Sequence, residues 1–311
     1  MSTTANTANL EKYAPRYWPT WVGIGVMWSL TRLPYSWQIG IGHVIGSLVY
    51  RLAKHRRHIA RVNLSLCFPE LNKSQLELLL KQHFSSLGIG LMETAMTWWM
   101  PSNRLKNLVK VEGLENLYQA LDRKKGVILL SGHFTTLEIG GRLLSLYTPF
   151  HAMYREHKNP VIESVMRDGR ARSCGNVIDR RDLRAVLRAL QQNNPIWYAP
   201  DQDYGIRHGI FVPFFGVPAA TTTATSRIAA KSGAAVVPFF QVRLPRGRGY
   251  QLTLSPALEN FPSGDAEADT RRVNKLFEQR IKENPSQYIW VHRRFKTRPA
   301  GEVSLYDSKN K

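Results

Sequence analysis

Residues 126–141 read Gly-Val-Ile-Leu-Leu-Ser-Gly-His-Phe-Thr-Thr-Leu-Glu-Ile-Gly-Gly, and this stretch decides the fold that we expect. A short apolar run bounded by turn residues is typical of a buried strand. Gly132 permits a tight turn, and the residues from Thr136 to Leu146 have the pattern of a helix. The stretch therefore predicts a strand, a turn that carries His133, and then a helix.

The same alternation continues along the chain. Further buried strands are predicted at 195–199 and 234–240, and further helices at Pro160–Ser173, Leu183–Gln192 and Thr222–Ser232. This order predicts an α/β fold with a largely parallel sheet flanked by helices. Two other predictions are a long helix over Ser74–Met100, with Ser74 as its N-cap, and an edge strand at Tyr250–Leu254.

The amino-terminal stretch Trp18–Tyr50 is rich in tryptophan, contains Arg32 as its only formal charge, and is divided by Pro34. A spanning helix needs about 20 apolar residues, so one span, a shallow hairpin and two interfacial helices all fit the pattern. A buried helix pair of a soluble protein is the competing interpretation. We expect an N-terminal tail at 1–16, a membrane-anchoring helical segment at 17–52 and one catalytic α/β domain at 53–311.

The net charge of the chain limits the classes of partner that we expect. Forty-three Lys and Arg against 23 Asp and Glu leave a formal charge of +20, which favours anionic partners. Five basic residues between Arg51 and Arg61, with no acid among them, indicate the cytoplasmic side of a membrane with an anionic surface. Nucleic acid is not expected as a partner, because the basic residues are spread over several elements and no binding motif is present.

His133 and Glu138 are the candidate catalytic pair. On one continuous helix their side chains would point about 140° apart, so His133 must precede the helix for Glu138 to hold one imidazole N–H. The other ring nitrogen would then serve as a general base. Two plainer interpretations compete: His133 is structural, and Thr135–Glu138 is a capping box. No metal site is expected, because the spacing differs from His-Glu-x-x-His and no third ligand is nearby.

Several stretches in order resemble the bacterial late acyltransferases of lipid A biosynthesis, which belong to the lysophospholipid acyltransferase superfamily with its His-x4-Asp/Glu motif. Besides His133–Arg142, the resemblance covers Pro15–Trp18, Asn63–Glu70, Gly90–Thr94, Trp197–Gly205 and His292–Pro299. It implies a glycerol-phosphate acyltransferase-like fold. It also implicates His133 and Glu138 in catalysis, together with Arg170 and Asp201.

The resemblance further implies an acyltransferase that uses acyl carrier protein as donor and a lipid A precursor glycolipid, Kdo2-lipid IVA, as acceptor, without a metal or organic cofactor. The expected reaction is the transfer of a lauroyl chain to the hydroxyl of a 3-hydroxyacyl chain, at the bacterial inner membrane with the catalytic domain on the cytoplasmic side. A palmitoleoyl- or myristoyl-transferring paralogue is the alternative. A glycerolipid acyltransferase fits less well, because its Pro-Glu-Gly motif is missing from the region 211–219.

Arginines in the middle of the chain are the candidates for binding the acceptor. Arg155 and Arg170 belong to a group that also includes Arg172, Arg180 and Arg181. Guanidinium groups bind phosphate or carboxylate with two parallel hydrogen bonds, and a solvated basic surface is the alternative for each of them except Arg170. Asp201 is expected to orient Arg170 or to close a turn. The basic cluster Arg293–Arg298 suits either the anionic membrane or the acidic carrier protein.

Overall fold

A computed structural model describes residues 12–154, 157–171, 177–179 and 182–307 of the chain. Seven strands of this described part form one sheet in the order β1-β9-β8-β2-β5-β3-β4. The bounds of its strands are Val109–Glu112 (β1), Val127–Leu130 (β2), His151–Tyr154 (β3), Val177–Asp179 (β4), Pro195–Tyr198 (β5), Ala235–Arg243 (β8) and Tyr250–Leu254 (β9). Every neighbouring pair is parallel except β8 and β9. The predicted α/β fold with a largely parallel sheet is therefore confirmed.

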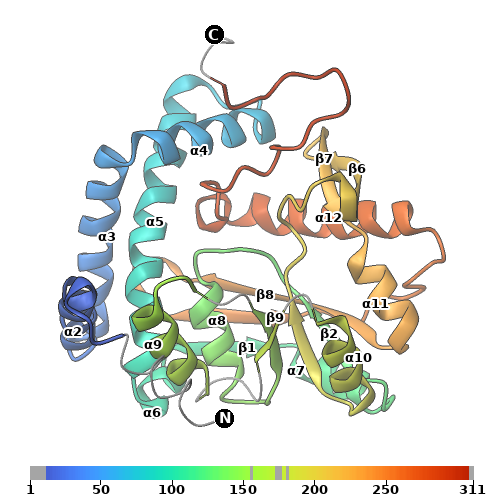
Figure 1. Ribbon diagram of the computed structural model, residues 1–311, viewed down its shortest axis with the longest axis horizontal. Helices are drawn as coiled ribbons and strands as arrows, with labels where there is room; N and C mark the ends of the chain where they lie inside the picture. The colour runs from blue at the N-terminus through green and yellow to red at the C-terminus, as the bar shows by residue number, and fades with distance from the viewer. Residues whose placement is uncertain (1–11, 155–156, 172–176, 180–181, 308–311) are drawn as a thin grey trace.

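Helices cover both faces of this sheet (Figure 1). The helices are Trp18–Leu30 (α2), Tyr35–Leu52 (α3), Lys54–Cys67 (α4), Lys73–Trp99 (α5), Ser102–Lys106 (α6), Leu114–Leu121 (α7), Leu137–Leu144 (α8), Pro160–Ala171 (α9), Leu183–Gln191 (α10), Ala224–Ser232 (α11) and Ala266–Glu283 (α12). In β2, Ile128 and Leu130 pack into a core with residues of α10, α11 and α12, whereas Val127 and Leu129 pack with residues of α7 and α8. All four side chains of β2 are buried, which explains why this strand is wholly apolar.

Some predicted elements differ from the structure in instructive ways. The strand at Tyr250–Leu254 alternates as expected but is not at the edge, because β1 pairs with its outer side. The N-cap of α5 is Asn72 rather than Ser74, since the Asn72 side chain accepts from the Gln75 N–H and the Gln75 side chain accepts from the Asn72 N–H. A separate antiparallel hairpin, Gly209–Phe214 (β6) with Val217–Thr222 (β7), has no counterpart in the predicted alternation.

The amino-terminal apolar stretch forms two helices that separate at Pro34. Figure 1 shows α3 running beside α5, and glycines on both helices make this approach close. A Cβ atom on Gly88 of α5 would collide with the backbone of Gly42 and Gly46 of α3, so only glycine permits the observed packing. Among the described helices, none has the length and apolar composition required to cross a bilayer, so the expected spanning helix finds no support.

Candidate active site

His133 lies on the turn between β2 and α8, as predicted. The Ser131 N–H donates to the Tyr198 carbonyl at 2.9 Å, which extends the pairing of β2 with β5 by one residue. Helix α8 then begins at Leu137. His133 therefore lies at the carboxyl edge of the sheet, the edge at which open parallel α/β sheets bind their ligands.

Asp201 holds His133 from the neighbouring strand. This residue follows β5, which is parallel to β2, so both residues leave the same edge of the sheet. Its carboxylate accepts from the His133 ring, with 2.6 Å between Nδ1 and Oδ1, and from the His133 backbone N–H, with 2.8 Å between N and Oδ2. A carboxylate only accepts hydrogen bonds, so Nδ1 carries a hydrogen and Nε2 is the nitrogen available as a base.

Burial and charge set the protonation of this pair. The Asp201 side chain is fully buried, whereas 26% of the His133 side chain remains accessible. Burial lowers the pKa of His133, but the charge of Asp201 and its hydrogen bond outweigh burial and raise that pKa above 6.5. Burial raises the pKa of Asp201, yet the charge and hydrogen bonds of His133 lower it below its usual value. Asp201 is therefore ionised whenever His133 acts as a base.

Glu138 does not make the contact with His133 that the spacing predicted. Its Oε1 accepts from Nη2 of Arg170 on α9 at 2.5 Å, while the His133 ring is held at Nδ1 by Asp201. The capping-box alternative is also wrong, because Thr136 is the N-cap of α8 and no side-chain hydrogen bond caps this described helix end. Glu138 lies in the first turn of α8 and contacts Arg170 of α9, whereas Asp201 lies at the same sheet edge as His133.

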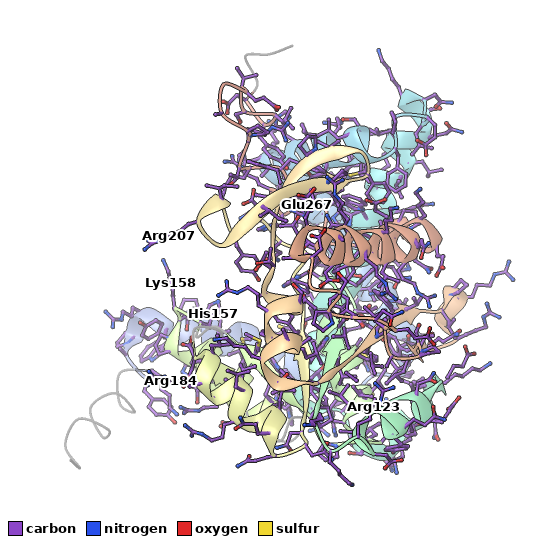
Figure 2. The ribbon with its side chains drawn as sticks, turned by 90° about the vertical axis from the view of Figure 1, so that its right-hand side faces the viewer. Arg123, His157, Lys158, Arg184, Arg207 and Glu267 are labelled. Carbon is purple, nitrogen blue, oxygen red and sulfur yellow. The ribbon has the colours of Figure 1, made fainter. Side chains whose placement is uncertain are left out.

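The predicted binding residues have different outcomes. Arg170 is paired with Glu138 and not with Asp201, so the expectation that Asp201 orients Arg170 is wrong. Arg155 lies outside the described residues, as do Arg172, Arg180 and Arg181. Many other cations are solvated surface: in Figure 2 the side chains of Lys158, Arg184 and Arg207 extend away from the body of the protein, and all three are exposed.

A segment near the carboxyl end, which local sequence patterns do not reveal as part of the site, lies against the His133 turn. Phe134 forms an antiparallel bridge with Tyr288, and the Tyr288 hydroxyl donates to the Asp201 carbonyl at 3.4 Å. His292, a few residues further on, is close enough for His133 to lower its pKa, although burial is the larger cause. Its inclusion in the family-like stretch His292–Pro299 was the signal available in the sequence. Within the described residues, no group of three or more metal-ligating side chains is present.

The protein combines a largely parallel α/β sheet with a His133–Asp201 pair at the carboxyl edge of two adjacent strands. A family model described as bacterial lipid A biosynthesis acyltransferase matches residues 8–297. The chain therefore belongs to the bacterial lipid A biosynthesis acyltransferase family, and the resemblance seen in the sequence is confirmed. It is an acyltransferase of lipid A biosynthesis.

Curated relatives span nearly the whole chain. The lipid A biosynthesis lauroyltransferase of Escherichia coli K12 is 43% identical over 96% of this chain and 99% of its own length. The palmitoleoyltransferase of the same organism is also 43% identical, over 94% of this chain and 95% of its own length. The myristoyltransferase of that organism is 30% identical over 95% of this chain and 92% of its own length. Identity alone does not separate lauroyl from palmitoleoyl transfer.

Proposed function

We propose that the protein transfers a fatty acyl chain, with lauroyl as the first choice, from the thioester of acyl carrier protein to the hydroxyl of a 3-hydroxyacyl chain on Kdo2-lipid IVA. One observation carries this proposal: Asp201 holds Nδ1 of His133, which leaves Nε2 for the proton of a hydroxyl group. The names of the relatives support a lipid A precursor as acceptor, and the lauroyl- and palmitoleoyltransferases are equally similar to this chain.

The chemistry uses His133 twice. Nε2 removes the proton of the acceptor hydroxyl while its oxygen attacks the thioester carbonyl. The C–S bond then breaks, and the imidazolium returns the proton to the leaving thiolate. Asp201 fixes the imidazole tautomer and stabilises the imidazolium that forms between the two steps. These steps transfer the acyl group directly to the acceptor hydroxyl without an acyl-enzyme, so no Ser or Cys nucleophile is required.

Glu138 and Arg170 are assigned to the acceptor. Their side chains are 22% and 15% accessible, so the pair is neither wholly buried nor free in solvent. We assign Arg170 to a phosphate or carboxylate of the glycolipid, with Glu138 fixing the rotamer of the guanidinium group. Arg155 is proposed for the same acceptor on the basis of the sequence alone.

A peripheral membrane anchor at 17–52, on the cytoplasmic side of the bacterial inner membrane, is part of the proposal. Apolar side chains remain exposed on both helices: Trp18, Val22 and Val26 of α2 are 61%, 67% and 53% accessible. On α3, Trp37, Val44 and Leu48 are 65%, 70% and 54% accessible. Each set follows helical spacing, so it forms a stripe of the kind that enters a lipid interface. The basic helix α4 follows directly and suits an anionic membrane surface.

Acyl transfer is tested with purified protein, Kdo2-lipid IVA and a panel of lauroyl, myristoyl and palmitoleoyl thioesters of acyl carrier protein, with the product identified by mass spectrometry. We expect one added acyl chain, lauroyl at the highest kcat/KM. His133→Ala, with its folding checked by circular dichroism, should reduce kcat by about 10²–10⁴-fold. No acylated product with any donor would refute the assignment of donor and acceptor. Near-normal turnover by His133→Ala would refute the mechanism.

Membrane binding is tested separately, with vesicles that contain anionic phospholipid. Val22→Asp places a charge on the exposed stripe of α2, and Val303→Asp is the matched control because Val303 is 68% accessible in the carboxyl-terminal segment. We expect Val22→Asp to weaken sedimentation with vesicles several-fold and Val303→Asp to leave it unchanged. Equal binding by both variants would exclude α2 as part of the anchor.

A further inference from the structure

The main chain of the His133 turn is held by a segment about 150 residues away in the sequence. The Thr135 N–H donates to the Gln287 carbonyl at 2.7 Å, and the Ile289 N–H donates to the His133 carbonyl at 2.9 Å. These bonds lie on either side of the bridge between Phe134 and Tyr288. His133 is thus fixed from two directions, by Asp201 on one side and by this short antiparallel pairing on the other.

Gln287 is itself fixed by the end of β8. Its Oε1 accepts from the Arg243 N–H at 2.9 Å, and its Nε2 donates to the Arg243 carbonyl at 2.9 Å. Both hydrogen bonds are buried, and the side chain of Gln287 substitutes for a strand partner of Arg243. One side-chain amide therefore joins the last residue of a core strand to the segment that holds the catalytic turn.

Arg243 is anchored in turn by the long helix α5. Its guanidinium group donates to both carboxylate oxygens of Glu93, at 2.5 and 2.6 Å, in a pair whose side chains are 8% and 1% accessible. A further N–H donates to Ser86 Oγ at 3.0 Å, and Ser86 Oγ shares a hydrogen bond of 2.8 Å with Thr135 Oγ1. The contacts therefore form a closed ring that starts and ends at Thr135.

We propose that Gln287 is a positioning residue for His133, acting with the Glu93–Arg243 pair to fix the catalytic turn against Asp201. A buried ion pair gains little net stability but imposes one geometry, because both partners need their hydrogen bonds. The ring transmits that geometry to the main chain on both sides of Phe134. This inference rests on the proposed catalytic role of His133.

Gln287→Met tests the proposal because it keeps the size of the side chain and removes both hydrogen bonds to Arg243. Gln38→Met is the matched control: Gln38 is fully buried, and its amide donates to the carbonyls of Thr31 and Leu33 in the loop between α2 and α3. Gln287→Glu is the conservative variant, since burial against the Arg243 carbonyl favours the protonated acid, which keeps both an acceptor for the Arg243 N–H and a donor for its carbonyl. Each variant is measured for thermal unfolding, for kcat and KM, and for the pKa of His133 by NMR titration.

We expect Gln287→Met to lose about 10–100-fold in kcat with little change in KM, because small displacements of a catalytic group cost that much. Gln287→Glu should recover part of that loss, and Gln38→Met should lose stability without losing kcat. The pKa of His133 should fall in Gln287→Met, since burial remains while contact with Asp201 weakens. Two other titratable groups lie near the His133–Asp201 pair: His292 interacts with the charge of His133, and the Tyr288 hydroxyl donates to the Asp201 carbonyl. Glu138 on α8 is paired with Arg170.

The titration separates this inference from the proposed function, because it needs no turnover. If the unaltered protein shows no acyl transfer, the proposed function is refuted. The titration of His133 would still test the positioning role of Gln287. An unchanged kcat and an unchanged pKa of His133 in Gln287→Met would overturn the positioning role. Equal losses of kcat in Gln287→Met and Gln38→Met would reduce the role of Gln287 to general stability.

Discussion

Asp201→Asn changes one atom of the carboxyl group that holds His133, and the structure predicts how that change propagates. The carboxylate of Asp201 accepts from the His133 backbone N–H with one oxygen and from the ring Nδ1 with the other. An asparagine offers only one oxygen. If that oxygen keeps the backbone N–H, the amide NH₂ faces Nδ1, which must then become an acceptor. The ring hydrogen moves to Nε2, and the nitrogen that should remove the substrate proton is no longer basic.

The alternative orientation of the asparagine is costly. With its oxygen toward Nδ1, the amide NH₂ would face the backbone N–H of His133, and a buried donor without an acceptor costs about 1–3 kcal/mol. The tautomer needed for catalysis would therefore be rarer by about 5- to 150-fold. Loss of the negative charge that stabilises the imidazolium adds to this effect. We expect a fall in kcat of about 10²–10⁴-fold in total.

The pH dependence gives a second measurement with a definite sign. His133 acts as a base only when it is neutral, and Asp201 raises its pKa above 6.5 against the opposing effect of burial. In the unaltered protein, kcat/KM should therefore rise as the pH passes through this raised pKa. In Asp201→Asn the pKa of His133 falls, so the residual activity should persist to lower pH.

Asp203→Asn is the matched control for the assay of acyl transfer. Asp203 lies two residues away and is also buried, but its carboxylate accepts from the backbone N–H groups of Gly205 and Thr297. Asp203→Asn should lower the stability of the protein and leave unchanged the pH at which kcat/KM rises. The reasoning about the tautomer would be refuted if Asp201→Asn retained more than about a tenth of kcat, or if both variants lost activity equally.

Two further predictions concern the acceptor and the amino-terminal helices. Glu138→Gln keeps the shape of the partner of Arg170 but removes its charge, so acceptor KM in initial-rate assays should rise by about tenfold while kcat changes less; a fall in kcat at constant KM would assign Glu138 to catalysis instead. Gly46→Ala should lower the free energy of unfolding by about 1–3 kcal/mol in urea titrations, because the new methyl group would overlap the Phe84 carbonyl of α5. Gly40→Ala, which meets nothing within 4 Å, should raise it by up to about 1 kcal/mol, and equal shifts for both would contradict the packing argument.

The order of the large elements could be predicted from the sequence because burial acts on each locally. A strand inside a parallel sheet is covered on both faces, so Val127–Leu130 is apolar throughout and recognisable without its neighbours. Smaller elements lack that signal. β4 has three residues of which two are exposed, and β1 has β9 as its one neighbour among the described strands, a strand too distant in sequence for the pairing to be recognised.

The site shows the same division. Sequence alone determined that His133 stands on a turn at the end of a buried strand, because the apolar run, Gly132 and the helical pattern are all local. The spacing in the sequence predicted Glu138 as the partner of the His133 ring, whereas in the folded protein the partner is Asp201. The reason is topological: β2 and β5 are adjacent and parallel, so residues 68 positions apart meet at one sheet edge. Pairing across a sheet and the return of Gln287 to the turn are long-range contacts, and only the folded chain brings them together.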